Sequence, residues 1–268
     1  MDLTSYLLGK KSSGGGGGSG DYDWKALGFD DVPGIVKNGY NYAVEIQKNW
    51  VPQKNLMNKF RNDTTITFMP YVDTSIATNM QQMFIGCNNM YDIALLDTSN
   101  VTDMQVMFRE CYKLEKIPLF DTSNVVKMNS TFTSCSAITS VPLFNTQNVT
   151  TMSSMFSSCS KLISVPLFNT QNVTDMSGMF NYCNDLTTVP IFNTSKVTTM
   201  NTMFYNCKKL TDQSLDNILQ MCINATSYTG TKTLSILGIN NTTVYPVSRI
   251  EALPHYQDFV NAGWTIGY

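Results

Sequence analysis

The amino-acid sequence predicts an α/β solenoid of six 24-residue strand–helix repeats, closed by an N-terminal and a C-terminal cap. Three recurring positions lead to this prediction. A methionine stands seven residues before each cysteine of a regular series, and a phenylalanine stands three residues before it. Self-similarity at a fixed period of about 20–50 residues is the signature of a stacked repeat architecture. The cysteines, spaced 24 residues apart, are Cys87, Cys111, Cys135, Cys159, Cys183 and Cys207.

One half of each repeat has helical spacing. In the repeat at 142–165, apolar residues from Val149 to Cys159 follow one another at steps of three and four. That spacing places them on one face of a helix or a tight helical turn. Asn145 or Asn148 precedes this stretch, and either is a suitable cap. We therefore expect a short helix in each repeat, with the methionine and phenylalanine side chains in the core.

The other half of each repeat has the pattern of a short buried strand. Leu162, Val165 and Leu167 form its apolar series, with Ile163 and Ser164 on the outer side. A proline follows, and because proline cannot donate to a strand ladder, the strand should end just before it, after three or four residues. Stacked strands would form a parallel sheet along one side of a continuous core. The prolines are Pro118, Pro142, Pro166 and Pro190.

The flanking segments are interpreted as caps, because a solenoid must cover the apolar faces of its end coils. The repeats are assigned to residues 70–213 and the N-terminal cap to residues 21–69. Within this cap, the apolar pattern predicts an amphipathic helix over 33–50 and a first strand over 64–69.

The C-terminal cap is assigned to residues 214–268. We expect a helix over 214–223 and a strand over 233–239. A final helix is expected over 247–262, disturbed at Pro254 because proline interrupts the helical hydrogen bonds.

The first 20 residues are assigned to a tether. Residues 12–20 form a Gly/Ser linker, a composition that behaves as a flexible chain. Residues 1–11 are therefore expected to form an anchor peptide that is tied to the folded body and not packed in it. The candidate anchor side chains are Leu3, Tyr6, Leu7 and Leu8.

Charge and hydropathy exclude several classes of partner. Charged residues make up 14% of the chain, the net charge is −2, and neither sign collects into a run. A protein that neutralises nucleic-acid phosphates needs a basic stripe, so no nucleic-acid partner is expected. No stretch approaches the ~18 consecutive apolar residues of a membrane span, so no membrane insertion is expected. The N-terminus places its lysines after a short apolar stretch, the reverse of a secretory signal, so no export signal is expected.

The motif from Asp97 to Leu114 reads Asp-Thr-Ser-Asn-Val-Thr-Asp-Met-x-x-Met-Phe-x-x-Cys-x-x-Leu, and it returns with Asn-Thr-Gln from Asn169 to Leu186. It resembles the BspA-like leucine-rich repeats of bacterial surface proteins, also described as Treponema-type or mycoplasma-lipoprotein-type repeats. The resemblance covers the repeats at 70–213. It implies a right-handed leucine-rich-repeat solenoid and a role in adhesion or ligand binding, and it brings no catalytic residues.

The start of the chain has a different resemblance. Its Asp-Leu-Thr-Ser-Tyr-Leu-Leu-Gly-Lys-Lys, followed by glycines, is similar to the start of phage and prophage tail or fibre proteins. The BspA-like surface proteins carry a signal peptide or a lipobox cysteine, and the sequence departs from them in both. The second resemblance implies a virion protein, made in the cytoplasm, whose N-terminal peptide binds another virion component.

Two side-chain columns could be ligands or core. Zinc sites use paired cysteines two to four residues apart, and the sequence has no such pair, which favours buried cysteines that act as small hydrophobes. Stacked thiols could oxidise, although identical positions on stacked coils seldom meet disulfide geometry. The recurring Met-x-x-Met-Phe could be a soft-metal surface or packed core. Thr131 replaces one methionine, a change that favours core packing.

The acidic residues and the histidine also allow a functional interpretation. Asp73, Asp97 and Asp121 form a file that could bind calcium, but asparagines take their place in the later repeats, which favours an Asx turn. His255 is the only histidine, and no Ser/His/Asp arrangement or pair of catalytic carboxylates accompanies it. Gly14 to Gly18 lacks the Lys-Ser/Thr of a phosphate-binding loop. We therefore expect no enzyme, no cofactor and no metal.

A binding surface is expected where residues vary between repeats while the core stays fixed, next to each cysteine and on the outer side of each strand. Tyrosines and charges at such positions suit contact with a protein or a glycan. The candidate residues are Arg109, Tyr112, Lys113, Lys116, Lys161, Tyr182, Tyr205, Lys208 and Lys209.

These observations predict a non-enzymatic binding or structural protein. The first hypothesis is a phage or prophage tail, fibre or head-decoration component located in the virion, which presents the repeats to a protein or glycan on a host cell. The second is a BspA-like adhesin on a bacterial cell surface. Either hypothesis leaves an oligomer open.

Overall fold

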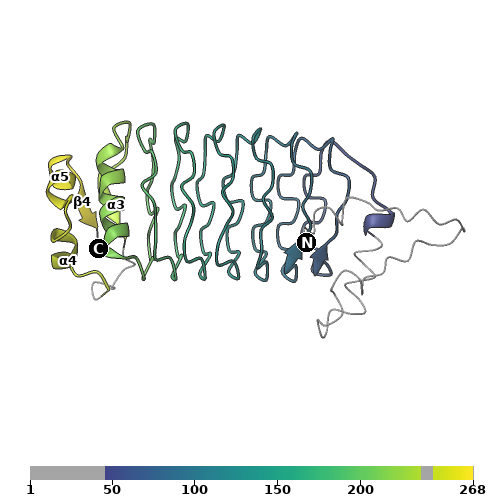
Figure 1. Cartoon of the computed structure of the whole chain (residues 1–268), viewed down its shortest axis with the longest axis horizontal. Coiled ribbons are helices and arrows are strands. Elements are labelled where there is room, and N and C mark those ends of the chain that lie inside the picture. The colour runs from purple at the N-terminus through teal and green to yellow at the C-terminus, as the bar shows by residue number, and fades with distance from the viewer. Residues whose placement is uncertain (1–45, 237–243, 268) are drawn as a thin grey trace, which may run out of the picture.

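A computed structural model describes residues 46–236 and 244–267 of the chain. Figure 1 shows a row of coils stacked along the long axis, with the labelled helices gathered at the C-terminal end. A ladder of parallel bridges joins residues that are 24 positions apart, so each coil corresponds to one sequence repeat. The residues of this ladder are Asn55, Asn79, Asp103, Lys127, Thr151, Asp175 and Thr199.

The ladder begins one coil before the first repeat that the cysteine series marks. Asn55 pairs with Asn79, and in this first coil Leu56 and Phe60 take the places of methionine and phenylalanine. Both are buried, and the Phe60 ring stacks on Phe84 at 5.5 Å between centroids. The segment assigned to the N-terminal cap therefore contains a further coil. The cysteine column could not reveal it, because Asp63 stands where later coils have cysteine.

The predicted helix of each repeat does not form. Residues 49–211 are all described, and none of them is in an α-helix. Backbone N–H groups alternate between two partners: the Phe108 N–H donates to Thr131 C=O of the next coil at 2.8 Å, and the Cys111 N–H donates to Phe108 C=O at 3.1 Å. The spacing of three and four between buried residues therefore reflects consecutive turns. Every second backbone N–H of these turns bonds to the neighbouring coil, and these bonds hold the stack together.

Two residues in each of these coils have positive φ. One lies two residues after each methionine of the column, and the other lies one residue before each cysteine. A positive φ at the third position of a turn characterises a type II turn, and it ends helical continuity. The first column is Gln82, Val106, Ser130, Ser154, Gly178 and Thr202; the second is Gly86, Glu110, Ser134, Ser158, Tyr182 and Asn206.

The predicted strands are shorter than expected. On the side of the described coils where the strands were predicted, β1, Phe68–Met69, pairs in parallel with β2, Asp92–Ile93. The same side also has a single bridge between Ser164 and Thr188. The regular ladder instead runs along the opposite half of the repeat, just before each methionine. There, Val and Thr supply side chains that suit extended backbone.

The core consists of side chains stacked on copies of themselves. The Phe84 and Phe108 rings lie 5.4 Å apart, and a second column places Phe144 6.4 Å from Phe168. The methionines of the first column and all seven cysteines are buried, and the cysteines are free. Core packing of the methionine column and burial of the cysteines as small hydrophobes are therefore confirmed.

Polar ladders run beside this core. Asp97 Oδ1 accepts from the Ser99 N–H at 3.0 Å, and the equivalent bonds of the later asparagines confirm the Asx turn. The buried Thr98 hydroxyl donates to Asp121 C=O of the next coil at 2.8 Å. Asn148 does not cap a helix, because its side-chain amide donates to Ser123 C=O of the preceding coil at 2.7 Å.

The C-terminal cap begins with α3, Asp212–Asn224, whose N-cap Thr211 accepts from the Ser214 N–H at 3.2 Å. Its apolar face covers the last coil in place of another repeat. Two further contacts fix the cap: the buried Tyr245 hydroxyl accepts from the Leu210 N–H at 2.6 Å and donates to Cys207 C=O at 2.8 Å.

The rest of the cap packs against α3. Strand β3, Thr233–Ser235, pairs in parallel with β4, Thr265–Gly267. The helix expected over 247–262 is split into α4, Val247–Glu251, and α5, Tyr256–Asn261, with Pro254 between them. His255 joins α5 to α3, because its Nδ1 lies 2.7 Å from the buried Asp216 carboxylate.

Parts of the expected caps and tether lie outside the described residues. These are the tether, the helix at 33–50 up to residue 45, and the end of the strand at 233–239. Residues 46–48 are helical, and Trp50 donates from Nε1 to Asp73 C=O at 2.7 Å. No helix among the described residues is both long enough and apolar enough to cross a membrane.

Candidate functional site

An open groove of about 740 Å³ crosses the coils near the middle of the stack. Its floor is the coil at 137–142, and its walls come from the coil before and the coil after. Lysines stand on both walls, Lys116 on one and Lys161 on the other. The lining residues are Glu115, Lys116, Ile117, Ala137, Thr139, Ser140, Val141, Pro142 and Lys161.

Small side chains on one coil create the groove. Ala137 and Ser140 occupy the positions held by Lys113 and Lys116 in the preceding coil. In the following coil, Lys161 stands in the position of Ala137. Because the backbone of each coil follows the same path, shorter side chains between longer ones leave a depression in the outer surface.

The backbone ladder is also interrupted at the groove. One series of N–H to C=O bonds links residues 24 apart on this side of the coils, including Glu115 to Tyr91 at 3.1 Å and Ile163 to Thr139 at 3.0 Å. Within the described coils, the rung absent from this series is the one between the Thr139 N–H and Glu115 C=O. We call this pair of groups the open rung. Both residues line the groove.

The groove has a net positive charge on its walls, from two lysines and one glutamate. Among the described residues, neither Lys116 nor Lys161 forms an ion pair, whereas Lys209 lies 2.7 Å from Asp185. Burial raises the pKa of the nearby Asp92 carboxyl, and the Lys116 ammonium group opposes that rise. Glu115 supplies one carboxylate on the same wall as Lys116.

Two of the other predicted surface residues lie on the coil before the groove floor, although neither lines the groove. Tyr112 is exposed, and its C=O accepts from the Ser136 hydroxyl at 3.3 Å, next to the groove floor. Lys113 donates to Asn89 Oδ1 at 2.8 Å. Arg109 does not line the groove; it pairs with its neighbour Glu110 at 3.1 Å.

The remaining predicted residues form a second group on the later coils. The Tyr182 and Tyr205 rings meet edge to face at 5.6 Å, and Lys208 and Lys209 are exposed. None of these four lines the groove. The structure therefore divides the predicted surface into two groups. The candidate anchor residues Leu3, Tyr6, Leu7 and Leu8 lie outside the described residues.

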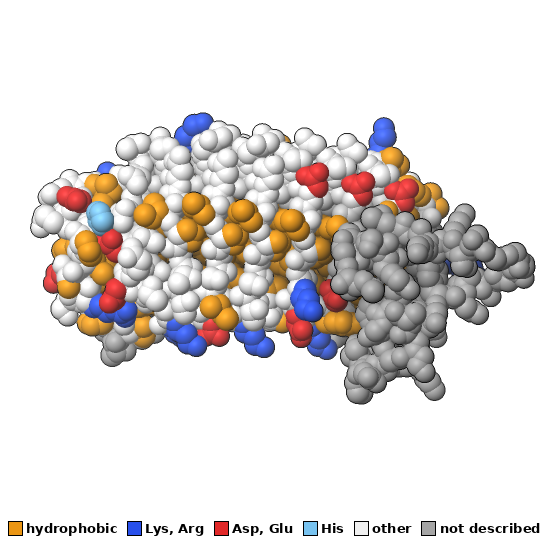
Figure 2. Space-filling view, in the orientation of Figure 1, with side chains coloured by type: hydrophobic (Ala, Val, Ile, Leu, Met, Phe, Trp, Pro, Cys, Tyr) orange, Lys and Arg blue, Asp and Glu red, His pale blue; other side chains and the backbone are white. Residues whose placement is uncertain are grey.

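An exposed apolar column was missed by the sequence reasoning. Figure 2 shows hydrophobic side chains in rows along the length of the coils. Leu143 is 60% exposed, whereas the next residue, Phe144, is 2% exposed. This in-and-out alternation after each proline was the available signal. We call the exposed residues with this period the leucine column; they are Leu95, Leu119, Leu143, Leu167 and Ile191.

The leucine column borders the groove. Ile117 and Val141 line one end of the groove, and each is followed after one proline by a leucine of the column, Leu119 or Leu143. A ligand in the groove would therefore have polar groups beneath it and apolar side chains beside it, the combination that fixes a ligand's orientation in protein sites.

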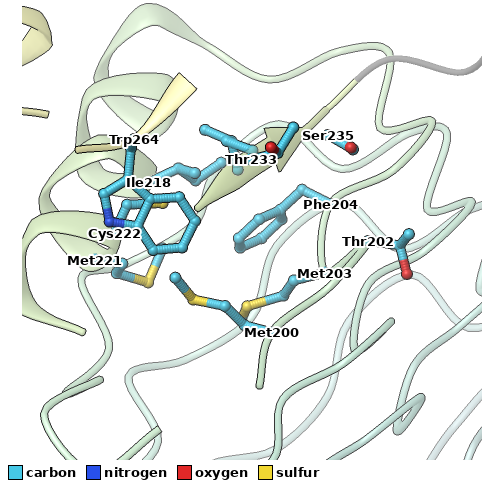
Figure 3. A pocket seen from close by; sticks show the side chains of 11 residues that line it. Met200, Thr202, Met203, Phe204, Ile218, Met221, Cys222, Thr233, Ser235 and Trp264 are labelled. Carbon is cyan, nitrogen blue, oxygen red and sulfur yellow. The ribbon is translucent and has the colours of Figure 1, made fainter. Parts of the chain in front are cut away.

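A second cavity lies between the last coil and the C-terminal cap. Figure 3 shows Met200, Met203, Phe204 and Trp264 around it. Its volume of about 10 Å³ is no more than one water molecule requires. Trp264 Nε1 is buried here without a hydrogen-bond partner among the described residues. This cavity is a packing gap at the seam of the cap, too small for a ligand.

Within the described residues, no cluster of three or more His, Cys, Asp or Glu side chains is arranged to hold a metal ion. The groove offers ammonium groups, hydroxyls and one open rung, all of which are binding groups.

Comparison with known families decides what kind of repeat this is. A family described as "Mycoplasma protein of unknown function, DUF285" matches residues 54–163, 78–188 and 138–231, which together span more than half of the chain. The chain belongs to this family. Membership confirms the resemblance to the BspA-like leucine-rich repeats that the motif at Asp97–Leu114 predicts.

The crystal structure of the T. pallidum leucine-rich repeat protein is similar to this BspA-like chain, with 20% sequence identity and a TM-score of 0.42. The match covers 57% of this chain and 81% of that one. Among curated proteins, none matches the sequence.

Proposed function

We propose that this BspA-like protein is a non-enzymatic binding protein that presents its repeat surface to a protein or glycan on a host cell. In this proposal, six full repeats form a right-handed solenoid that serves as a rigid scaffold. The observation that carries the proposal is the groove with the open rung. It brings an open rung, two lysines and several hydroxyls together at one place on the stack.

Cell binding tests this proposal. The fluorescently labelled full-length protein should bind host cells saturably, and Ser140→Tyr, which fills the groove floor, should reduce that binding about tenfold or more. Ser160→Tyr, at a partly exposed position of the next coil that does not line the groove, is the matched control. Binding that is absent, or that both variants leave intact, would remove the groove from the proposal.

For the carrier, we propose a phage or prophage virion. Residues 1–11 would bind a tail, fibre or head component, and the Gly/Ser linker at 12–20 would let the repeats move independently. Deletion of residues 2–11 should abolish incorporation into particles and leave the thermal unfolding of the repeats unchanged. Normal incorporation of the deletion variant would end the virion proposal.

A second candidate is a BspA-like adhesin on a bacterial cell surface, and the family membership favours it. Fractionation of the producing cells separates the two carriers. Protease-accessible protein on intact cells, in a culture free of phage particles, would select the adhesin. Protein that co-sediments with particles would select the virion.

A further inference from the structure

We propose that the open rung and its two flanking lysines bind a single carboxylate of an acidic saccharide, such as a uronic or sialic acid residue. This inference rests on the proposed binding function and names the ligand class for the same groove. Three features carry it: an unpaired backbone donor, two unpaired ammonium groups and a floor of hydroxyls.

The backbone donor is the Thr139 N–H. Its counterparts at Glu115, Ile163 and Thr187 each donate to the preceding coil, at 2.9–3.1 Å. The Thr139 N–H has no hydrogen-bond partner among the described residues, and Thr139 is exposed, so this N–H can bind an acceptor from solution. A carboxylate is the strongest acceptor for such a group, because hydrogen bonds to an ionised partner are about twice as strong as neutral ones.

The lysines approach this donor from opposite sides. Lys116 and Lys161 belong to the coils before and after the floor, so they are roughly two coil spacings, or about 10 Å, apart along the stack, and they are offset by three positions within the repeat. Lysine side chains have long flexible stems and carry point charges, so both ammonium groups can reach an anion held at the floor. Neither has to break an existing ion pair to do so.

The rest of the groove fits a sugar ring that carries this carboxylate. The Thr139 and Ser140 hydroxyls can donate to and accept from ring hydroxyls, and Glu115 C=O of the open rung can accept from one. Ile117, Val141 and Pro142 form an apolar end against which the C–H face of a ring can pack. The groove is open along one side, as a chain of sugar units requires.

The same geometry disfavours an acidic peptide. An extended peptide that adds to a sheet edge needs a row of free backbone groups, and here the open rung offers one N–H and one C=O. The Glu115 carboxylate beside Lys116 would also repel a second negative charge close to the first. The ligand should therefore carry isolated carboxylates among neutral hydroxyls, as an acidic saccharide does.

Calorimetric titration of the full-length protein tests the inference. The probes are an oligosaccharide of alternating neutral and uronic acid units, the same oligosaccharide with its carboxyl groups reduced to alcohols, and an oligo-glutamate peptide. We expect the acidic oligosaccharide to bind at least tenfold more tightly than either of the others. The double variant Lys116→Ala/Lys161→Ala should lose at least tenfold in affinity. Lys196→Ala removes an exposed lysine outside the groove and should change nothing.

A second measurement keeps the test independent of variant folding. In the wild-type protein, the acidic oligosaccharide should shift the amide ¹H–¹⁵N resonances of Thr139 and Ser140 more than those of Thr187 and Thr188, their counterparts two coils later. Equal binding of the reduced oligosaccharide, or tighter binding of the peptide, would overturn the acidic-saccharide assignment. If cells bind the protein through the groove while the acidic oligosaccharide does not, this inference fails and the proposed function stands.

Discussion

Cys135 donates a hydrogen bond from Sγ to the backbone C=O of Phe108, 27 residues earlier, at 3.1 Å. The other five cysteines of the column make the equivalent bond to the preceding coil at 3.1–3.2 Å. Each thiol is therefore both a small apolar filler and a donor that must keep its proton. Burial raises the pKa of every one of these thiols.

This arrangement predicts a loss of stability at alkaline pH. Burial raises the pKa of Cys207 from 9.0 to about 12, so the unfolded chain releases this proton at lower pH than the folded one. The stabilisation is complete below pH 9.0 and is lost as pH rises toward the folded value. Each buried cysteine should then cost about 1.4 kcal/mol of the unfolding free energy per pH unit above 9. Urea denaturation at pH 8 and pH 10, under reducing conditions, measures this change in the unfolding free energy.

The control for this prediction is Cys207→Ala. The variant is less stable at pH 8 because it leaves a small cavity, but its loss between pH 8 and pH 10 should be smaller than that of the wild type by one cysteine's share. A wild-type unfolding free energy that stays constant across this range would contradict the prediction.

The sequence predicted the core well and its backbone poorly, for one physical reason. Met104, Phe108 and Cys111 are buried as expected, because burial depends on which residues face inward, and their spacing gives that directly. Steps of three and four are equally compatible with a helix and with consecutive turns. What decides between them is whether the N–H of Phe108 bonds within its own coil or to the next one, a tertiary choice that a single repeat does not encode.

The groove was only partly predictable for a related reason. Lys116 and Lys161 were selected because they vary between repeats, and they do line it. The open rung at Thr139 depends on how three successive coils pack, and no local motif marks it. The leucine column had a readable signal, the alternation of Leu143 and Phe144, but Leu167 was assigned to the buried strand pattern, although it is 60% exposed.

Val106 gives a second prediction. It has φ 62° in a column where the other residues are Gln, Ser, Gly or Thr. A β-branched residue with positive φ is strained, and such strain costs of order 1–3 kcal/mol. Val106→Gly should therefore raise the unfolding free energy by about 1 kcal/mol, measured by urea denaturation. The reciprocal change, Gly178→Val, should lower it, because Gly178 has φ 60° and an added Cβ would lie 3.2 Å from Ser154 Oγ. Two shifts of the same sign would refute this account of the turn.

Leu143 and Phe144 give a third prediction. Phe144 is buried in the second aromatic column, so Phe144→Ala should cost about 3–5 kcal/mol of unfolding free energy. Leu143→Ala, one residue away, should stay within about 0.5 kcal/mol of the wild type because its side chain is in solvent. Thermal and urea unfolding of the two variants compare them directly. A large loss for Leu143→Ala would mean that the leucine column is already covered in the folded protein.

The open rung predicts an asymmetry between two threonines at equivalent positions. Thr187 donates from its N–H to Ile163 C=O at 2.9 Å, whereas the Thr139 N–H makes no bond to Glu115. Proline removes the N–H at either position. Thr187→Pro should therefore cost about 1–3 kcal/mol of unfolding free energy, since it leaves a carbonyl without its ladder partner. Thr139→Pro has no such bond to lose and should cost distinctly less in the same urea titration. If the two substitutions destabilise the protein equally, the rung at Thr139 is closed in solution, and the groove has no free backbone donor to offer a ligand.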